Sequence, residues 1–231
     1  MMIAPDRPKA ARILTWNIHR GIGADRRFDL ARIIALQEVD SRGRDPQDLP
    51  LAALKTALGS HAAEAKTIVA EDGHYGHVLI SRWPMEHVQL HDVSIGRREP
   101  RCAIEAVIAA PQGLFRVVAT HLGLGLGERK RQIARLVELA RKHDEPFGCV
   151  MLGDFNDWHG EVRRAMTDLL PAWSMLRTFP ARRPLFKLDR IFCRPPGALG
   201  RCWTDPEGRR ASDHLPVIAE LQLEALVAPI A

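Results

Sequence analysis

The chain has 231 residues, of which 46% are hydrophobic, so it can bury a sizeable core, and we expect one α/β domain over residues 1–231. Its formal net charge of +5 favours an anionic partner such as nucleic acid, a phosphorylated metabolite or a lipid surface, although a well-solvated arginine-rich surface would give the same value. No apolar stretch approaches the roughly 20 residues of a membrane span, so we expect neither a transmembrane segment nor a signal peptide.

Cysteine usage favours a reducing compartment. The four cysteines, Cys102, Cys149, Cys193 and Cys202, show no CxxC spacing and lie mostly in apolar runs, where a free thiol behaves as a small hydrophobic group. We therefore expect a cytoplasmic protein, and we expect it to be a monomer.

The first half of the chain predicts mainly strands, because short apolar runs alternate with Pro, Gly and Asp residues that favour turns. A helix is expected over residues 47–58, where leucines recur at helical spacing before Gly59. The expected strands of this half cover residues 12–18, 33–39, 61–70, 77–82, 87–93, 101–109 and 114–121.

The second half predicts two helices and three strands. Residues 128–143 form the clearest helix, since their apolar side chains make one continuous stripe. The other expected elements are a strand at 148–152, a short helix at 160–170 and strands at 187–193 and 215–223. This mixture of adjacent strands and separated helices favours two stacked sheets with helices outside over a simple βαβ winding.

Polar side chains stand where several expected strands end or begin. These residues are Asn17, Glu38, His121, Asp154, Asn156, Asp213 and His214, together with Asp189 inside a strand. Ligand sites gather at such strand ends because rigid elements aim the side chains there. Residues two apart on a strand point to the same face, so Asp154 and Asn156 are expected to address one site if the strand continues.

These residue types permit metal-assisted phosphate chemistry. Carboxylates such as Glu38 and Asp154 suit Mg²⁺ or Mn²⁺, whereas His121 and His214 can donate to phosphate or transfer protons. Asp189 could fix the tautomer of His214. Each residue alone has a simpler interpretation, as a turn, a helix cap, a solvated strand end or a hydrogen-bonded histidine, so their joint occurrence in order is what favours a site.

Eight short motifs make the sequence similar to a known family. They are TWNI, ALQEVD, YGHVLISRWP, EPR, THLGLG, LGDFND, LDRIF and SDHLPV, spread over residues 12–223. The ordered set strongly resembles the endonuclease/exonuclease/phosphatase (DNase I-like) family of metal-dependent phosphoesterases. The resemblance implies a four-layer αββα sandwich, in which two packed mixed β-sheets carry helices on their outer faces and the active site lies at one end.

The resemblance also implies a divalent cation, Mg²⁺, with Mn²⁺ as a possible substitute. Glu38 would be its main ligand, with Asn17 and Asp213 near the metal. The cation would neutralise the phosphate while water attacks in line, and no covalent enzyme intermediate would be needed.

Five further residues would have catalytic roles by the same resemblance. Asp154 would activate or orient the attacking water, and Asn156 would position the phosphate. His214 would contact the phosphate and take part in proton transfer with support from Asp189, and His121 would bind phosphate or act as a general acid.

Two features depart from the family. Only residues 19–32 connect the first two strands, where relatives have a full helix, so either this helix is reduced to about one turn or a segment is missing. The placement of Asn17 and Glu38 depends on this connection. In YGHVLIS, His77 stands where many relatives have Asn; His74 and His77 lack a third metal ligand, which favours substrate contact or an exposed position for His77.

Basic residues near the expected site favour a polyanionic substrate. We expect Arg101 and His77 to contact a substrate phosphate. The other basic residues in question are Arg97, Arg98, Arg129, Lys130, Arg131, Arg182, Arg183, Lys187 and Arg190. Only 6% of the residues are aromatic, which leaves few stacking platforms for bases.

The sequence therefore predicts a Mg²⁺-dependent phosphodiesterase, with nucleic acid as the expected substrate. A phospholipid head-group phosphodiesterase and a small-molecule phosphomonoesterase remain alternatives. A third interpretation is a nucleic-acid-binding module on a degenerate enzyme fold, but binding alone would not need carboxylates that face a polyanion.

Overall fold

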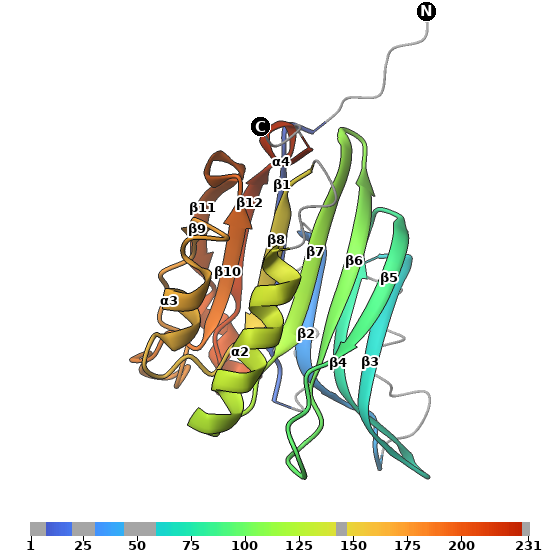
Figure 1. The fold of residues 1–231 in the computed structure, drawn as a ribbon, viewed down its shortest axis with the longest axis vertical. Helices are drawn as coiled ribbons and strands as arrows, with labels where there is room; N and C mark the ends of the chain where they lie inside the picture. Colours follow the sequence, from blue (N-terminus) through green and yellow to red (C-terminus); the bar gives the residue numbers. More distant parts are fainter. Residues whose placement is uncertain (1–7, 20–30, 44–58, 142–146, 228–231) are drawn as a thin grey trace, which may run out of the picture.

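Two six-stranded mixed sheets pack face to face in the computed structural model, which describes residues 8–19, 31–43, 59–141 and 147–227 (Figure 1). The first sheet has the order β11 (Leu199–Thr204), β12 (Val217–Gln222), β1 (Ala10–Asn17), β2 (Ala31–Asp40), β4 (Gly73–Ser81) and β3 (His61–Ala70). The second has the order β5 (Met85–Asp92), β6 (Cys102–Ala110), β7 (Gly113–His121), β8 (Cys149–Asp154), β10 (Asp189–Arg194) and β9 (Ala172–Trp173).

Each sheet contains one parallel pair of strands, and the remaining pairs are antiparallel. In the first sheet β1 runs parallel to β2, and in the second β7 runs parallel to β8. Because parallel strands end at the same edge of a sheet, the polar residues that close β1, β2, β7 and β8 are brought to one end of the sandwich.

Inward-facing side chains of both sheets form one apolar core between them. On β8, Val150 and Leu152 face this core, whereas Cys149 and Met151 alternate to the outer face. The helix α4 (Leu223–Val227) closes one end of the core, to which it contributes Leu223 and Leu226, and the 3-10 helix η3 (Pro196–Ala198) lies beside it.

Two helices, α2 (Leu126–Arg141) and α3 (Glu161–Met166), cover the outer face of the second sheet (Figure 1). Leu136 of α2 and Val162 of α3 are fully buried in one cluster with Met151 and Phe155. Burying a side chain of this size stabilises the fold by about 1.5 to 3 kcal/mol. Among the described helices, none combines the length and apolar character that crossing a membrane requires.

The expected two-sheet sandwich is confirmed, and each of the ten expected strands overlaps a strand of the structure. The helix expected at 160–170 is shorter, since α3 ends at Met166. The helix expected at 47–58 lies outside the described residues, which include no α-helix over the outer face of the first sheet. Three of the four implied layers are therefore described.

The edge strand β11 was not predicted. Among the described strands it pairs only with β12, and its side chains are exposed or half-buried, so it lacks the apolar alternation that reveals a half-buried strand. Gly200 within it further weakens the pattern. The 3-10 helix η4 (Pro206–Arg210) connects β11 to the SDH segment.

Candidate active site

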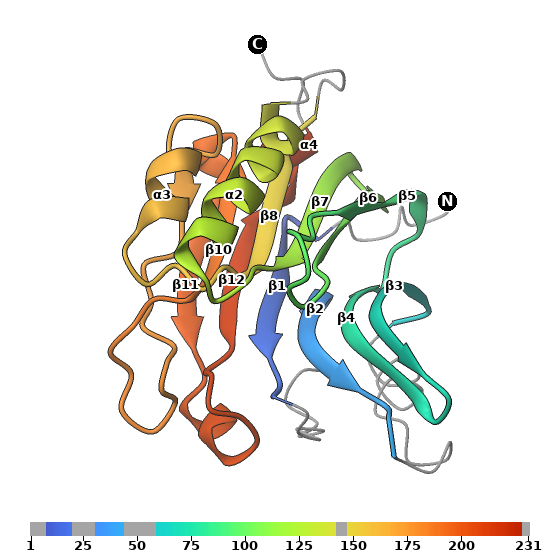
Figure 2. The same ribbon diagram turned by 60° about the horizontal axis from the view of Figure 1, so that its bottom comes forward.

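Along each central strand, the side chains that face the core form a row, and these rows end in polar residues at one end of the sandwich. Figure 2 shows this end turned toward the viewer. Val150 and Leu152 of β8 belong to the core, and Asp154 is the next residue of that row. On β7, Val117 and Ala119 lead in the same way to a histidine at the strand end. The apolar rows thus position polar side chains between the sheets, where water is largely excluded.

Three neighbouring strands hold a row of three buried polar residues. The register of β7, β8 and β10 pairs Asp154 with His121 on one side and with Asp189 on the other. Gly153 permits this arrangement, because its φ is 151° and a Cβ atom there would overlap the carbonyl oxygen of Thr120 on β7. The glycine that interrupts the apolar run is therefore needed where the backbones of β7 and β8 come close.

Asp154 lies at the centre of the site and is 1% exposed. Its Oδ1 accepts a hydrogen bond from the backbone N–H of Asn156 at 2.9 Å, and its Oδ2 accepts one from Nδ2 of Asn17 at 3.1 Å. The Nε2 atoms of His121 and His214 lie 3.7 and 3.8 Å from the same Oδ2. One carboxylate oxygen thus faces two imidazoles, one at the end of β7 and the other in the segment before β12.

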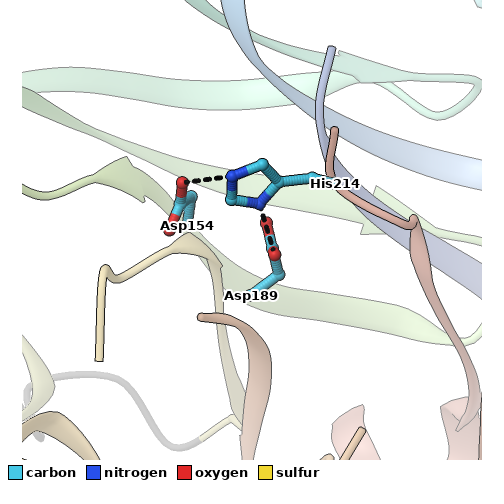
Figure 3. Close-up of side chains that lie close together, drawn as sticks. All are labelled: Asp154, Asp189 and His214. Atoms are coloured by element: carbon cyan, nitrogen blue, oxygen red, sulfur yellow. Dashed lines mark hydrogen bonds and ion pairs between the residues drawn. The ribbon is translucent and has the colours of Figure 1, made fainter. Parts of the chain in front are cut away.

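Asp189 and His214 form a tight pair beside Asp154 (Figure 3). Nδ1 of His214 lies 2.8 Å from Oδ2 of Asp189. Although burial lowers it, the negative charges of Asp189 and Asp154 raise the pKa of His214 to about 10. Burial, followed by the charge of Asp189, raises the pKa of Asp154 to about 6. His214 is therefore cationic at neutral pH, and Asp154 can exchange a proton near neutrality.

The segment that carries His214 is anchored to β1. Nε1 of Trp16 donates to the carbonyl oxygen of His214 at 2.8 Å, and the Ser212 hydroxyl donates to the carbonyl oxygen of Asn17 at 2.6 Å. The same hydroxyl accepts from the backbone N–H of His214 at 3.1 Å. These hydrogen bonds connect the TWN and SDH motifs, which are almost two hundred residues apart in the sequence.

Arg101 and His77 lie on the β7 side of the site. Nη1 of Arg101 is 3.2 Å from Nδ1 of His121, and burial together with this positive charge lowers the pKa of His121 well below its ordinary value. Burial likewise lowers the pKa of His77 to about 4, although its ring is hydrogen-bonded to the backbone of Ala119. Arg101 and His77 are only 7% and 4% exposed, so little of either side chain is open to a substrate. Their contact with a substrate phosphate stays a prediction.

Glu38, Asn17 and Asp213 meet on the side of the first sheet. Nδ2 of Asn17 donates to Oε1 of Glu38 at 3.0 Å, so the short connection between β1 and β2 does not separate these residues, although residues 20–30 lie outside the described chain. Glu38 has a φ of 58° at an irregularity in the pairing of β2 with β4. Nδ1 of His19 lies 3.4 Å from Oε2 of Glu38 and 3.6 Å from Oδ1 of Asp213.

This second group of residues fits a divalent cation. Glu38 and Asp213 direct carboxylate oxygens toward one position, next to His19, and oxygen donors are the ligands that Mg²⁺ and Mn²⁺ prefer. Asp154, Asp189 and His214 also bring ligand atoms within 4.8 Å of one another. In that cluster the hydrogen bond between Asp189 and His214 already uses two of the three groups, so Glu38 is the better candidate for the metal.

The prediction that Asp154 and Asn156 point to the same face of one strand is wrong. β8 ends at Asp154, and Asn156 has a φ of 48°, so the two residues do not share a strand face. Nδ2 of Asn156 instead donates to the carbonyl oxygen of Leu122, at 2.8 Å, in the loop after β7. Its predicted role in positioning a phosphate stays a prediction.

Two arginines of the expected polyanion-binding set are structural. Arg129 is 1% exposed, pairs with Glu161 at 2.7 Å and also donates to the carbonyl oxygen of Leu124. Arg190 is buried against Asp157, with Nε and Nη2 both 3.0 Å from its Oδ2. The expectation that these two arginines contact a substrate backbone is therefore wrong, because both guanidinium groups are buried and paired with carboxylates inside the protein.

The Asp157 carboxylate also binds the backbone N–H groups of Val162 and Arg163, at 3.0 and 3.3 Å, so it joins α3 to β10. We expect Asp157→Asn to lower the free energy of unfolding by about 3 to 5 kcal/mol, because Arg190 would remain buried without its counter-charge. Urea unfolding measures this change, and Asp168→Asn on the exposed surface should change stability by less than about 0.5 kcal/mol. Equal effects of the two variants would contradict this structural role.

An aromatic wall next to His214 was not predicted from the sequence. Trp158, Phe179 and Phe186 form this aromatic wall, in which the Trp158 ring lies 5.7 Å from Phe179 and 5.0 Å from Phe186 between centroids. The Phe179 ring lies 4.8 Å from that of His214, and Phe186 is 40% exposed. The signal available in the sequence was only that Trp158 follows DFND and Phe186 precedes KLDR.

Comparison with known sequences identifies the group to which this architecture belongs. The model of the endonuclease/exonuclease/phosphatase family matches residues 14–214, which include every candidate residue described above. The protein YbhP of Escherichia coli K12 is 31% identical in an alignment of length 252 that covers 92% of this chain and 96% of YbhP.

Solved structures show the same fold. An endonuclease/exonuclease/phosphatase protein from Beutenbergia cavernae is 20% identical and has a TM-score of 0.72, over 93% of this chain and 72% of that chain. The 3′ phosphatase NExo from Neisseria, solved with a product DNA hairpin, is 21% identical and has a TM-score of 0.65, over 91% of this chain and 99% of that chain. The chain described here therefore belongs to the endonuclease/exonuclease/phosphatase family and has its DNase I-like sandwich fold.

Proposed function

We propose that this protein is a divalent-metal-dependent phosphodiesterase that hydrolyses nucleic acid by direct attack of water on phosphorus. The observation that carries the proposal is the buried Asp154 carboxylate, whose Oδ2 faces the Nε2 atoms of His121 and His214 at 3.7 and 3.8 Å. A carboxylate and two imidazoles around one point can accept a proton from water and hold the oxygens of a phosphate. The family to which the chain belongs hydrolyses phosphate esters, which supports this reaction type.

In this proposal Asp154 is the general base and His214 binds the phosphate. A pKa of about 6 leaves Asp154 mainly ionised at neutral pH and still basic enough to accept a proton. Hydrogen bonds from Asn17 and from the backbone of Asn156 fix the carboxylate. The charge of His214, stabilised by Asp189, strengthens its hydrogen bond to a phosphate oxygen.

Glu38, with Asn17 and Asp213, is proposed to hold the cation, which we infer to be Mg²⁺ with Mn²⁺ as a substitute. When bound, the cation would neutralise negative charge on the phosphate. The amide of Asn17 links the two halves of the site, because its Nδ2 donates to both Glu38 and Asp154.

Nucleic acid is the favoured substrate because of what surrounds the site. The aromatic wall offers ring faces and edges against which bases can stack next to His214. Arg182 and Arg183, which lie between two residues of this wall in the sequence, are exposed and can bind backbone phosphates. The description of NExo as a 3′ phosphatase with a DNA product supports the same substrate class.

A phospholipid head-group phosphodiesterase is the second candidate, because apolar side chains are exposed on the loop after β7, at the start of α2 and on the loop before β10. Leu124 is 69% exposed, Leu126 48% and Leu185 55%. Such residues can insert into a lipid surface, which would place the head-group phosphate near the site.

The test is hydrolysis by metal-stripped protein, with and without Mg²⁺ or Mn²⁺, of duplex DNA, abasic DNA, DNA with a 3′-phosphate, single-stranded RNA, phosphatidylcholine vesicles and a generic phosphomonoester. We expect metal-dependent cleavage of a nucleic acid that Glu38→Gln reduces strongly. Cleavage of the phospholipid alone would replace the first candidate by the second. Salt-sensitive DNA binding without turnover in either metal would support the non-enzymatic interpretation instead.

We also propose a cytoplasmic location. The four cysteines are unpaired in the structure, and Cys149 and Cys193 are buried. Free thiols are usual in a reducing compartment. Fractionation of cells that produce the tagged protein would test this location.

A further inference from the structure

Arg101 is a buried arginine whose guanidinium group contacts His121, another candidate site residue. It lies directly before β6, and its Nη1 donates to Oε1 of Glu99 at 2.9 Å and lies 3.2 Å from Nδ1 of His121. The side chain is 7% exposed. These partners fix the guanidinium group, so its contact with His121 is not that of a freely rotating surface arginine.

The chemistry of this contact determines where the proton of His121 resides. A guanidinium group carries only N–H donors, and an imidazole nitrogen can accept a hydrogen bond only when it bears no proton. Nδ1 of His121 must therefore be the acceptor, which leaves the single ring proton on Nε2. An added proton on Nδ1 would oppose an N–H of Arg101 and place two positive charges side by side.

We propose that Arg101 is a positioning residue that holds His121 as the neutral tautomer with its proton on Nε2. This nitrogen faces Oδ2 of Asp154 at 3.7 Å and thus the space where the phosphate would be attacked. His121 is then an uncharged hydrogen-bond donor to a phosphate oxygen, and not the general acid, because a neutral imidazole is a poor proton donor. Proton delivery to the leaving group falls to another group, for which the cationic His214 is placed.

The role toward phosphate rests on the proposed function, but the tautomer does not. ¹⁵N NMR of histidine-labelled, metal-free protein distinguishes the two neutral tautomers and the charged ring, and His121→Gln assigns the signals. We expect wild-type His121 to be neutral with its proton on Nε2 from about pH 5 to 8. A proton on Nδ1, or a charged ring at neutral pH, would overturn the proposal without any measurement of activity.

Variants of Arg101 separate positioning from general stability. Arg101→Met removes the donors, so we expect a mixture of tautomers and a kcat lower by about 10- to 100-fold on the cleaved substrate, with a smaller change in KM. Arg101→Lys retains a donor-only cation and should restore the tautomer and part of kcat. Arg201→Met, at an exposed position on β11, is the matched control and should change neither. An unchanged His121 tautomer in folded Arg101→Met would also contradict the proposal.

Discussion

Asp154→Asn should reduce metal-dependent hydrolysis by about 10³-fold or more while the protein remains folded. The substitution keeps the size of the side chain and an oxygen that can accept from the backbone N–H of Asn156. It removes the group that can accept a proton from water and turns the Nδ2 contact of Asn17 into one between two donors. Initial rates on the identified substrate, at saturating metal, measure the effect.

The effect of Asp154→Asn must be separated from a loss of structure. Asp168→Asn, at an exposed position after α3, is the matched control and should retain the wild-type rate. Circular dichroism of both variants should equal that of the wild type. A folded Asp154→Asn protein with more than about a tenth of wild-type turnover would contradict the role of Asp154 as the general base.

The positions of Asp154 and His121 could be predicted from the sequence because local pattern determines them. Alternation along β7 and β8 places both residues in inward-facing rows, and the Gly before Asp154 marks a close approach of two backbones. The ordered set of eight motifs supplied the sandwich fold, which alternation alone cannot give. Because both kinds of signal apply to Asp154 and His121, the sequence predicts that these two residues lie close together, which the structure shows.

Contacts that form only after the chain folds could not be predicted in this way. Arg101 directly precedes β6 and Arg190 is the second residue of β10, yet one contacts a histidine of the site and the other is buried against Asp157. The aromatic wall joins residues that are 28 positions apart, Trp158 and Phe186, and neither has an apolar repeat around it. The sequence shows their chemistry but not their partners.

Asp189→Asn should lower the pKa of His214 toward its ordinary value and reduce turnover by about 10²- to 10⁴-fold. The negative charge of Asp189 is the main factor that raises this pKa to about 10 against the effect of burial. An asparagine at this position also presents either an oxygen or an amino group to Nδ1 and no longer fixes the ring tautomer. NMR titration of the His214 ring in metal-free protein measures the pKa directly, and Glu224→Gln on the exposed surface is the control.

The same pair predicts how stability depends on pH. His214 has a folded-state pKa of about 10, above the ordinary value of 6.5, so its protonation stabilises the native state fully below about pH 6.5 and this contribution is lost as the pH rises through about 10. Unfolding free energies of metal-free wild type and Asp189→Asn should therefore differ most near pH 6, by about 2 to 4 kcal/mol, and converge above about pH 10. A difference that stays constant over this range would mean that Asp189 stabilises the fold by packing or hydrogen bonding alone, and not through the charge of His214.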